Sequence, residues 1–258
     1  MSIPLIMHGA AGRMGQRILS MAEGSDDFAV YCGVDREPGQ LSDLGLASHA
    51  PLLDSLPEEP GAVVIDFSHA GATPRVIEHC QAHGMPLAIG TTGIDPAILE
   101  PLLQQAGQAI PILAAPNMSV GVNLVFKVAA QIAQTLGIDY DIEIVETHHH
   151  HKVDAPSGTA FGIADAICSA TGRTRNDLVH GRVGQTGARR PGEIGMHSLR
   201  LGDVVGDHTA YFVGNGERIS LGHVAHSRDI FASGALRAAH FLARAEAGVY
   251  SMADVLGL

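Results

Sequence analysis

One short segment of this chain carries most of the side chains that could donate a proton or bind an anion. Four consecutive histidines, His148 to His151, are followed at once by Lys152 and, a few residues later, by Ser157-Gly158-Thr159. A histidine titrates near neutral pH and can act as a general acid. A lysine supplies a compact positive charge that attracts a carboxylate or donates a proton. The segment indicates acid catalysis on an anionic substrate.

The elements around this segment must position its side chains. An alternating, strand-like run from Tyr140 to Val145 leads into the histidines, and we expect the histidines to end that strand. Successive side chains of a strand point to opposite faces, so at most about two of the four can face one cleft. Ser157 opens a helix expected from Thr159 to Ala170, whose first N–H groups can bind a carboxylate. Asp154 can either cap that helix or orient Lys152.

Other interpretations of the histidines stay open. They could bind a metal in a hydrolase, although the HExxH motif is absent and the nearest carboxylates lack i,i+4 helical spacing. They could also belong to a surface loop without a role. A chain that senses a nucleotide without turning over a substrate is a third possibility. We expect an enzyme without a bound metal.

A glycine-rich turn near the start of the chain predicts a dinucleotide-binding unit. A strand at Pro4–Met7 runs into Gly9-Ala10-Ala11-Gly12-Arg13-Met14-Gly15, a helix follows, and a second strand at Phe28–Val34 ends at Asp35-Arg36. Glycines allow close approach of the pyrophosphate, the helix N-terminus offers N–H groups, and the carboxylate can accept from the ribose. Ala11 replaces the second glycine of the usual motif, so the flanking strands and Asp35, 20 residues after Gly15, carry the prediction.

The two arginines of this unit bear on the choice of cofactor. Asp35 favours NAD, whereas Arg13 and Arg36 could pair with the 2′-phosphate of NADP. We therefore expect NADH, NADPH or both as the cofactor.

Alternating strands and helices continue this first domain. Expected strands are Ala62–Phe67, Pro86–Ile89 and Ile110–Ala114, and expected helices are Pro74–His83 and Pro96–Ala106, after a loose connection at 37–60. Ligands bind at the carboxyl ends of parallel strands. Gly90-Thr91-Thr92 and Ala115-Pro116-Asn117-Met118 follow two such ends, where they could line the nicotinamide or simply form turns.

The pattern changes after Ser119. A long apolar helix at Val122–Leu136 precedes the histidine segment, and a charged, glycine-rich stretch at 173–193, expected to be a mobile loop, carries Arg189 and Arg190. Strand-like runs follow at 196–201, 208–213 and 217–224, and then a final helix at Ile230–Glu246. We predict an α/β protein with an N-terminal Rossmann-like dinucleotide-binding domain, residues 1–119 and 229–258. A smaller α+β substrate domain with an open mixed sheet is expected at residues 120–228.

Composition excludes several classes of protein. The 258 residues are 46% hydrophobic but only 4% aromatic, so the core must be aliphatic. The net charge of -11 disfavours nucleic acid, and the sequence contains neither a basic membrane-binding helix nor an apolar run long enough to span a bilayer. An odd number of cysteines, Cys32, Cys80 and Cys168, favours free thiols and a cytoplasmic location.

Taken together, these motifs resemble the 4-hydroxy-tetrahydrodipicolinate reductase (dihydrodipicolinate reductase) family over essentially the whole chain. Most specific is the run from Glu143-Ile-Val-Glu-Thr-His148 through Lys152 and Asp154 to Pro156-Ser-Gly-Thr-Ala160. The glycine turn, Asp35-Arg36, Gly90-Thr-Thr-Gly and Ala115-Pro-Asn-Met-Ser-Val-Gly-Val-Asn fit in the same order.

The resemblance implies a reaction and a role for each group. NADH or NADPH would deliver a hydride to C4 of a small cyclic dicarboxylate, with loss of the 4-hydroxyl as water, in the route to diaminopimelate and lysine. His148 would be the proton donor, and Lys152 would assist protonation and substrate binding. It further implies substrate contacts from His149, Gly158 and Thr159 and nicotinamide contacts from Gly90, Thr92 and Ala115–Met118. It gives His150 no role, and it implies a homotetramer joined through the sheets of the substrate domains.

Overall fold

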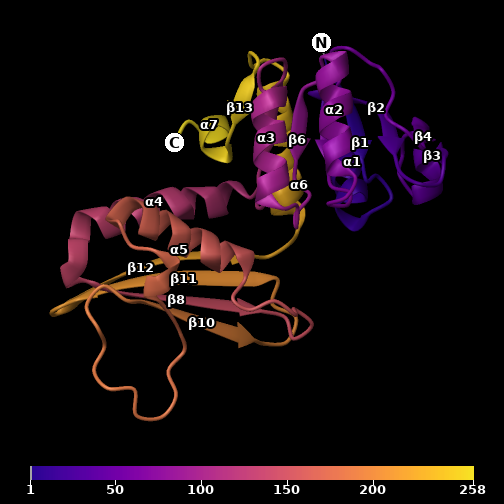
Figure 1. Cartoon of the computed structure of the whole chain (residues 1–258). Helices are drawn as coiled ribbons and strands as arrows, with labels where there is room; N and C mark the ends of the chain where they lie inside the picture. The colour runs from indigo at the N-terminus through magenta and orange to yellow at the C-terminus, as the bar shows by residue number, and fades with distance from the viewer. Residues whose placement is uncertain (1) are drawn as a thin grey trace. The chain divides into compact units, whose positions relative to one another are not determined.

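The computed structural model describes residues 2–258, and the chain folds as two compact units (Figure 1). The first unit combines Met1–Val120 with Asp229–Gly257, and the second consists of Gly121–Arg228 together with Leu258. The chain therefore leaves the first unit once and returns to it after completing the second.

The first unit is built on an eight-stranded sheet in the order β13-β7-β6-β5-β1-β2-β4-β3. Neighbouring strands are parallel except β3 and β4. The strands are β1 Ile3–His8, β2 Phe28–Val34, β3 Gly39–Gln40, β4 Pro51–Leu53, β5 Val63–Asp66, β6 Leu87–Ile89, β7 Pro111–Ala114 and β13 Gly248–Tyr250. The helices are α1 Arg13–Glu23, α2 Thr73–His83, α3 Pro96–Ala106, α6 Asp229–Leu242 and α7 Met252–Leu256. One buried cluster lies under α1 and α6 and another under α2 and α3, so helices cover both faces and the predicted Rossmann-like fold is confirmed.

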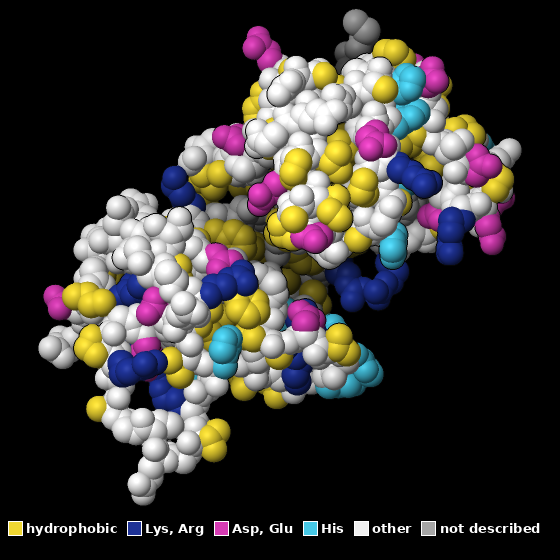
Figure 2. Space-filling view, in the orientation of Figure 1, with side chains coloured by type: hydrophobic (Ala, Val, Ile, Leu, Met, Phe, Trp, Pro, Cys, Tyr) yellow, Lys and Arg dark blue, Asp and Glu magenta, His cyan; other side chains and the backbone are white. Residues whose placement is uncertain are grey.

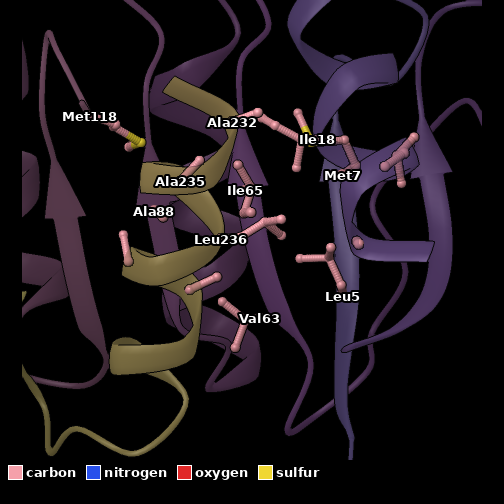
Figure 3. Close-up of a cluster of buried hydrophobic side chains, with 14 of the residues drawn as sticks. Leu5, Met7, Ile18, Val63, Ile65, Ala88, Met118, Ala232, Ala235 and Leu236 are labelled. Atoms are coloured by element: carbon pink, nitrogen blue, oxygen red, sulfur yellow. The ribbon is translucent and has the colours of Figure 1, made fainter. Parts of the chain in front are cut away.

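Helix α6 completes one layer of this core. Ala232, Ala235 and Leu236 of α6 face Val63 and Ile65 of β5 (Figure 3). Small residues on α6 let its backbone approach the sheet closely. The prediction that the core is aliphatic is confirmed here, because the cluster consists mainly of Ala, Leu, Ile, Val and Met side chains.

Replacing Gly234 of α6 by alanine is expected to destabilise the protein. A Cβ at this position would lie 1.7 Å from the carbonyl oxygen of Met118, a backbone atom that cannot rotate away. Overpacking of this kind costs about 1–3 kcal/mol. Urea unfolding followed by circular dichroism should show a lower midpoint for Gly234→Ala, while Ser233→Ala, at an exposed position of the same helix, should unfold like the wild type. Equal midpoints for all three proteins would contradict this packing.

The second unit is a five-stranded mixed sheet in the order β12-β11-β8-β10-β9. Strands β9, β10 and β8 are parallel, and β8, β11 and β12 are antiparallel, which confirms the predicted open mixed sheet. The strands are β8 Asp141–His148, β9 Leu178–His180, β10 Ile194–Arg200, β11 Gly206–Gly214 and β12 Glu217–Ala225. Helices α4 Val120–Leu136 and α5 Gly158–Thr171 cover one face of this sheet (Figure 1).

Strand β8 alternates more regularly than the sequence suggested. Ile142, Ile144, Glu146 and His148 are all buried, whereas the residues between them are partly exposed. The prediction that the histidines together end this strand is wrong beyond His148, because β8 stops there and the chain then turns. The turn removes the strand alternation, so the opposite-face argument does not apply to the last three histidines.

Three further predictions about local structure need correction. The connection at 37–60 contains β3, a 3-10 turn at Leu41–Leu44 and β4, which pairs with β2. The stretch at 173–193 contains β9, and its Arg189 is held by Asp141 and the backbone of β8. The final helix ends at Leu242, and β13 and α7 follow it. Strands of two or three residues are too short to give a readable alternation.

Candidate active site

A buried histidine–carboxylate pair lies at the end of β8. His148 and Glu146 are two residues apart on one strand and therefore point to the same face. The Nδ1 atom of His148 is 2.5 Å from Oε2 of Glu146, and the two residues are 8% and 1% exposed. The pair lies on the face of the sheet that α5 covers.

Glu146 is held from three directions. Arg200, on the neighbouring strand β10, donates from Nη1 to Oε2 and from Nη2 to Oε1, both at 3.0 Å. The backbone N–H of Ser157 donates to Oε1 at 3.2 Å. Burial alone would raise the pKa of Glu146, but the hydrogen bonds from Arg200, His148 and Ser198 outweigh it and lower that pKa. Glu146 is therefore a carboxylate at neutral pH.

A second buried histidine supports the start of α5. Ser157 caps that helix, since its hydroxyl accepts from the N–H of Ala160 at 3.1 Å, and it also lies 2.8 Å from Nε2 of His208. The rings of His208 and His148 meet edge to face, with centroids 5.0 Å apart. Burial, followed by the nearby charge of His148, lowers the pKa of His208 to about 4. His208 is consequently neutral near pH 7.

Lys152 is paired with an aspartate near the start of α5. Its Nζ lies 2.8 Å from Oδ1 of Asp154, and this hydrogen bond lowers the pKa of the Asp154 carboxyl. Because Ser157 caps α5, the structure assigns Asp154 to Lys152 rather than to the helix. A Cβ at Gly158, the first residue of α5, would have no described atom within 4 Å, so this helix end is open to a ligand.

The three remaining histidines differ in their surroundings. His150 and His151 are exposed with ring centroids 3.9 Å apart, and Figure 2 shows histidine side chains gathered on the surface of the second unit. His149 is partly buried, and burial together with the charge of His151 lowers its pKa. Within residues 2–258 no group of three or more His, Cys, Asp or Glu side chains is arranged to hold a metal ion.

The first unit contains a cavity of about 660 Å³ at the carboxyl end of its sheet. Its lining comes from the end of β1 and the glycine turn, from the end of β2, and from the chain after β4 and after β5. The residues are His8, Gly9, Ala11, Gly12, Val34, Asp35, Arg36, Asp54, Phe67, Ser68, His69 and Ala72. Five of the predicted cofactor residues are in this lining. The carboxylate of Asp35 accepts from the backbone N–H groups of Ala11 and Arg36, both at 2.9 Å, and so ties the glycine turn to β2.

The backbone of the glycine turn packs closely against the rest of the first unit. A Cβ at Gly9 would lie 2.4 Å from the carbonyl oxygen of Phe67, and one at Gly15 would lie 2.1 Å from that of Gly9. The backbone can take this tight path only without side chains at these positions. Helix α1 begins at Arg13 directly behind the turn, so its N-terminal dipole points at the cavity side of the loop. These residues fit the pyrophosphate of a dinucleotide.

Several predicted cofactor residues have other surroundings. The side chains of Ala10 and Met118 are buried in the core, which leaves only their backbone for a ligand. Thr91 donates to Asp66 and accepts from the backbone N–H of Ser68. The remaining predicted cofactor positions are outside the lining of the large cavity: Arg13, Met14, Gly90, Thr92, Ala115, Pro116 and Asn117.

Sequence reasoning missed a histidine–aspartate pair beside this cavity, of which only His8 is a lining residue. Nδ1 of His8, the last residue of β1, lies 2.8 Å from Oδ1 of Asp66, the last residue of β5. The two residues are register partners in neighbouring parallel strands. Burial would raise the pKa of Asp66, but hydrogen bonds from His8, Ser68 and Thr73 lower it. A charged residue closing an apolar strand was the signal that could have found this pair.

Glu146, Arg200 and His208 were also missed as site residues. They come from three different strands, β8, β10 and β11, and only the sheet register brings them together. A carboxylate at an inward position of an alternating strand was the available signal for Glu146.

Comparison with known proteins agrees with this architecture. Two family models match, dihydrodipicolinate reductase N-terminus over residues 3–118 and dihydrodipicolinate reductase C-terminus over residues 121–256. The 4-hydroxy-tetrahydrodipicolinate reductases of Myxococcus xanthus and Thiobacillus denitrificans are 47% and 44% identical, covering 99% and 100% of this chain and 98% and 100% of those proteins.

The fold likewise matches solved structures. A dipicolinate-bound dihydrodipicolinate reductase from Paenisporosarcina sp. TG-14 superposes with a TM-score of 0.76 at 23% identity, covering 97% of this chain and 98% of that one. An amine dehydrogenase from Mycobacterium smegmatis gives 0.61 at 12% identity, covering 98% and 95%. With both halves matched by family models and full-length relatives at this identity, the chain belongs to the dihydrodipicolinate reductase family.

Proposed function

We propose that this protein is a 4-hydroxy-tetrahydrodipicolinate reductase acting in diaminopimelate and lysine biosynthesis. The net reaction adds a hydride to C4 of the cyclic dicarboxylate, and the 4-hydroxyl leaves with a proton as water. The observation that carries the proposal is the buried Glu146–His148 pair, followed by Lys152 and the open N-terminus of α5, in a chain of this family. These groups suit a substrate with two carboxylates and a leaving hydroxyl.

Each unit then has its own task. We propose that residues 1–119 and 229–258 bind NADH or NADPH, which supplies the hydride when bound, and that residues 120–228 bind the substrate. His148 donates the proton that leaves with the hydroxyl. Lys152 attracts a substrate carboxylate, and the α5 N-terminus at Gly158 and Thr159, with His149, contacts the substrate. In the cofactor unit we assign the pyrophosphate to the glycine turn and the adenosine ribose to Asp35.

Turnover is the direct test. The purified protein should oxidise NADH or NADPH only when 4-hydroxy-tetrahydrodipicolinate is supplied. The loss of nicotinamide absorbance measures this oxidation. Cofactor binding without oxidation would instead support a nucleotide-sensing module. Retention of stoichiometric zinc after chelator treatment, with no cofactor binding, would support a metal-dependent hydrolase.

Arg36 is expected to discriminate between the two cofactors. It lines the cavity beside Asp35 and can pair with the 2′-phosphate of NADPH. Loss of a charge-assisted contact costs about 1.5–3 kcal/mol, so Arg36→Ala should weaken NADPH binding by roughly 10- to 10²-fold. Titration of nicotinamide fluorescence measures this directly, and NADH on the same variant is the control. Equal weakening of NADH and NADPH binding would mean that Arg36 stabilises the loop and does not contact the 2′-phosphate.

We further propose that the protein is a cytoplasmic homotetramer joined through the second unit's sheet. Helices cover one face of this sheet, and the other face carries the exposed apolar side chains of Leu199, Val213 and Val224. The cysteines of the described chain are free and buried, as suits a reducing compartment. Light scattering of the purified protein tests the oligomer. None of the helices in residues 2–258 is both long and apolar enough to cross a membrane.

A further inference from the structure

We propose that Glu146, clamped by Arg200, is the positioning residue that fixes the tautomer of His148, so that the proton used in the reaction is carried by Nε2. The proposal rests on the proposed role of His148 as proton donor and adds the residues that enable His148 to donate a proton. Glu146 touches the reacting groups only through His148.

The hydrogen bonds around Glu146 set the direction of proton donation. Both carboxylate oxygens accept from groups that can only donate, the guanidinium of Arg200 and the backbone N–H of Ser157. The carboxylate is thereby held in its ionised form, which can only accept. Nδ1 of His148, 2.5 Å away, must therefore carry a hydrogen. Nε2 is left as the ring nitrogen that gains and loses the catalytic proton.

The charges around the imidazole also match the task of an acid. Glu146 stabilises protonated His148, but Arg200 neutralises much of that effect, since the two form a bidentate ion pair. The other titratable groups on this side include His208 on β11, which is neutral, and its register partner His223 on β12. The turn after β8 adds His149, Lys152 and Asp154.

The arrangement also fixes where the ring points. Arg200 donates from Nη2 to the carbonyl oxygen of Asp154 at 2.6 Å, so one guanidinium ties β10 to Glu146 and to the turn that carries Lys152. The His208 ring packs edge to face with the His148 ring and, through Ser157, is tied to the start of α5. A ring held at Nδ1 and packed against a neighbouring ring has little freedom to rotate.

The test compares Glu146→Gln with Glu143→Gln, a glutamate on the opposite face of the same strand that has its own arginine partners. For Glu146→Gln we expect kcat to fall by about 10- to 10²-fold, less than for removal of the acid itself, with little change in KM or in cofactor Kd. An acid must be protonated to act, so kcat/KM falls as pH rises through its pKa. Glu146→Gln removes a negative charge from beside His148 and so disfavours its protonated form, and the fall should move to lower pH. Glu143→Gln should leave both unchanged.

Nitrogen-15 NMR of histidine-labelled protein gives a second readout that needs no turnover. In the wild type above the pKa, His148 should carry its hydrogen on Nδ1, and in Glu146→Gln the two tautomers should mix. A wild-type hydrogen on Nε2 overturns the proposal whatever the activity. If the wild type turns over and Glu146→Gln keeps its kcat and pH profile, the positioning role fails while the reductase function stands. If the wild type does not turn over at all, the function fails and the NMR result still decides the tautomer.

Discussion

Replacing His148 by glutamine should lower kcat by about 10²–10⁴-fold, the usual effect of losing a general acid. Glutamine keeps an N–H that can donate to Glu146, so the buried carboxylate does not lose its partner and the fold should persist. Cofactor binding should be almost unchanged, because the dinucleotide cavity is lined entirely by residues of the first unit.

The matched control is His150→Gln, which changes an exposed histidine two positions away. Steady-state kinetics at saturating NADPH, together with a cofactor titration of each variant, separates the two outcomes. We expect His150→Gln to behave like the wild type. If His148→Gln retains the kcat of the wild type, another residue donates the proton and the assignment of His148 is wrong.

Replacing Lys152 by alanine should weaken substrate binding and lower kcat. The bound substrate carboxylate loses its cationic partner, and the reacting groups lose a nearby positive charge. A charge-assisted contact is worth about 1.5–3 kcal/mol, so kcat/KM should fall by roughly 10- to 10²-fold. The only other lysine, Lys127, is exposed on α4 and makes Lys127→Ala the natural control.

Lys152→Arg distinguishes charge from geometry. Arginine keeps the positive charge but spreads it over a planar fork that cannot deprotonate and is bulkier than an ammonium group. The Asp154 carboxylate, 2.8 Å from Nζ, sets the position that a guanidinium would have to occupy. We expect partial recovery in KM and little in kcat. Full recovery of both would show that Lys152 supplies only charge.

Sequence patterns predicted the elements with strong periodicity and missed those decided by pairing across the sheet. Strand β2 and helix α3 have the predicted bounds. Strand β2 is an almost continuous apolar run, and α3 begins at a proline and is followed by a glycine. Strands β3 and β13 have two and three residues, and they form because a neighbouring edge is available. The local sequence of these strands does not indicate that a neighbouring sheet edge is available.

The candidate site divides in the same way. His148 and Lys152 lie in one segment whose residue types and spacing indicate acid catalysis, so the sequence alone was enough to predict them as site residues. Glu146 was visible only once β8 was known to alternate through His148, and Arg200 and His208 depend on strand register. The histidines beyond His148 were misjudged because a turn, not the strand, holds them.

The return of the chain to the first unit has a consequence for synthesis on the ribosome. Helix α6 covers apolar strand residues such as Val63 and Ile65, yet all of Gly121–Arg228 is translated between those strands and α6. While the ribosome makes the second unit, one face of the first sheet is covered by α1 without α6, and β13 is not yet there to close the edge beside β7. The nascent first unit therefore exposes apolar sheet surface while the second unit is translated, and its sheet is complete only after β13 has been made.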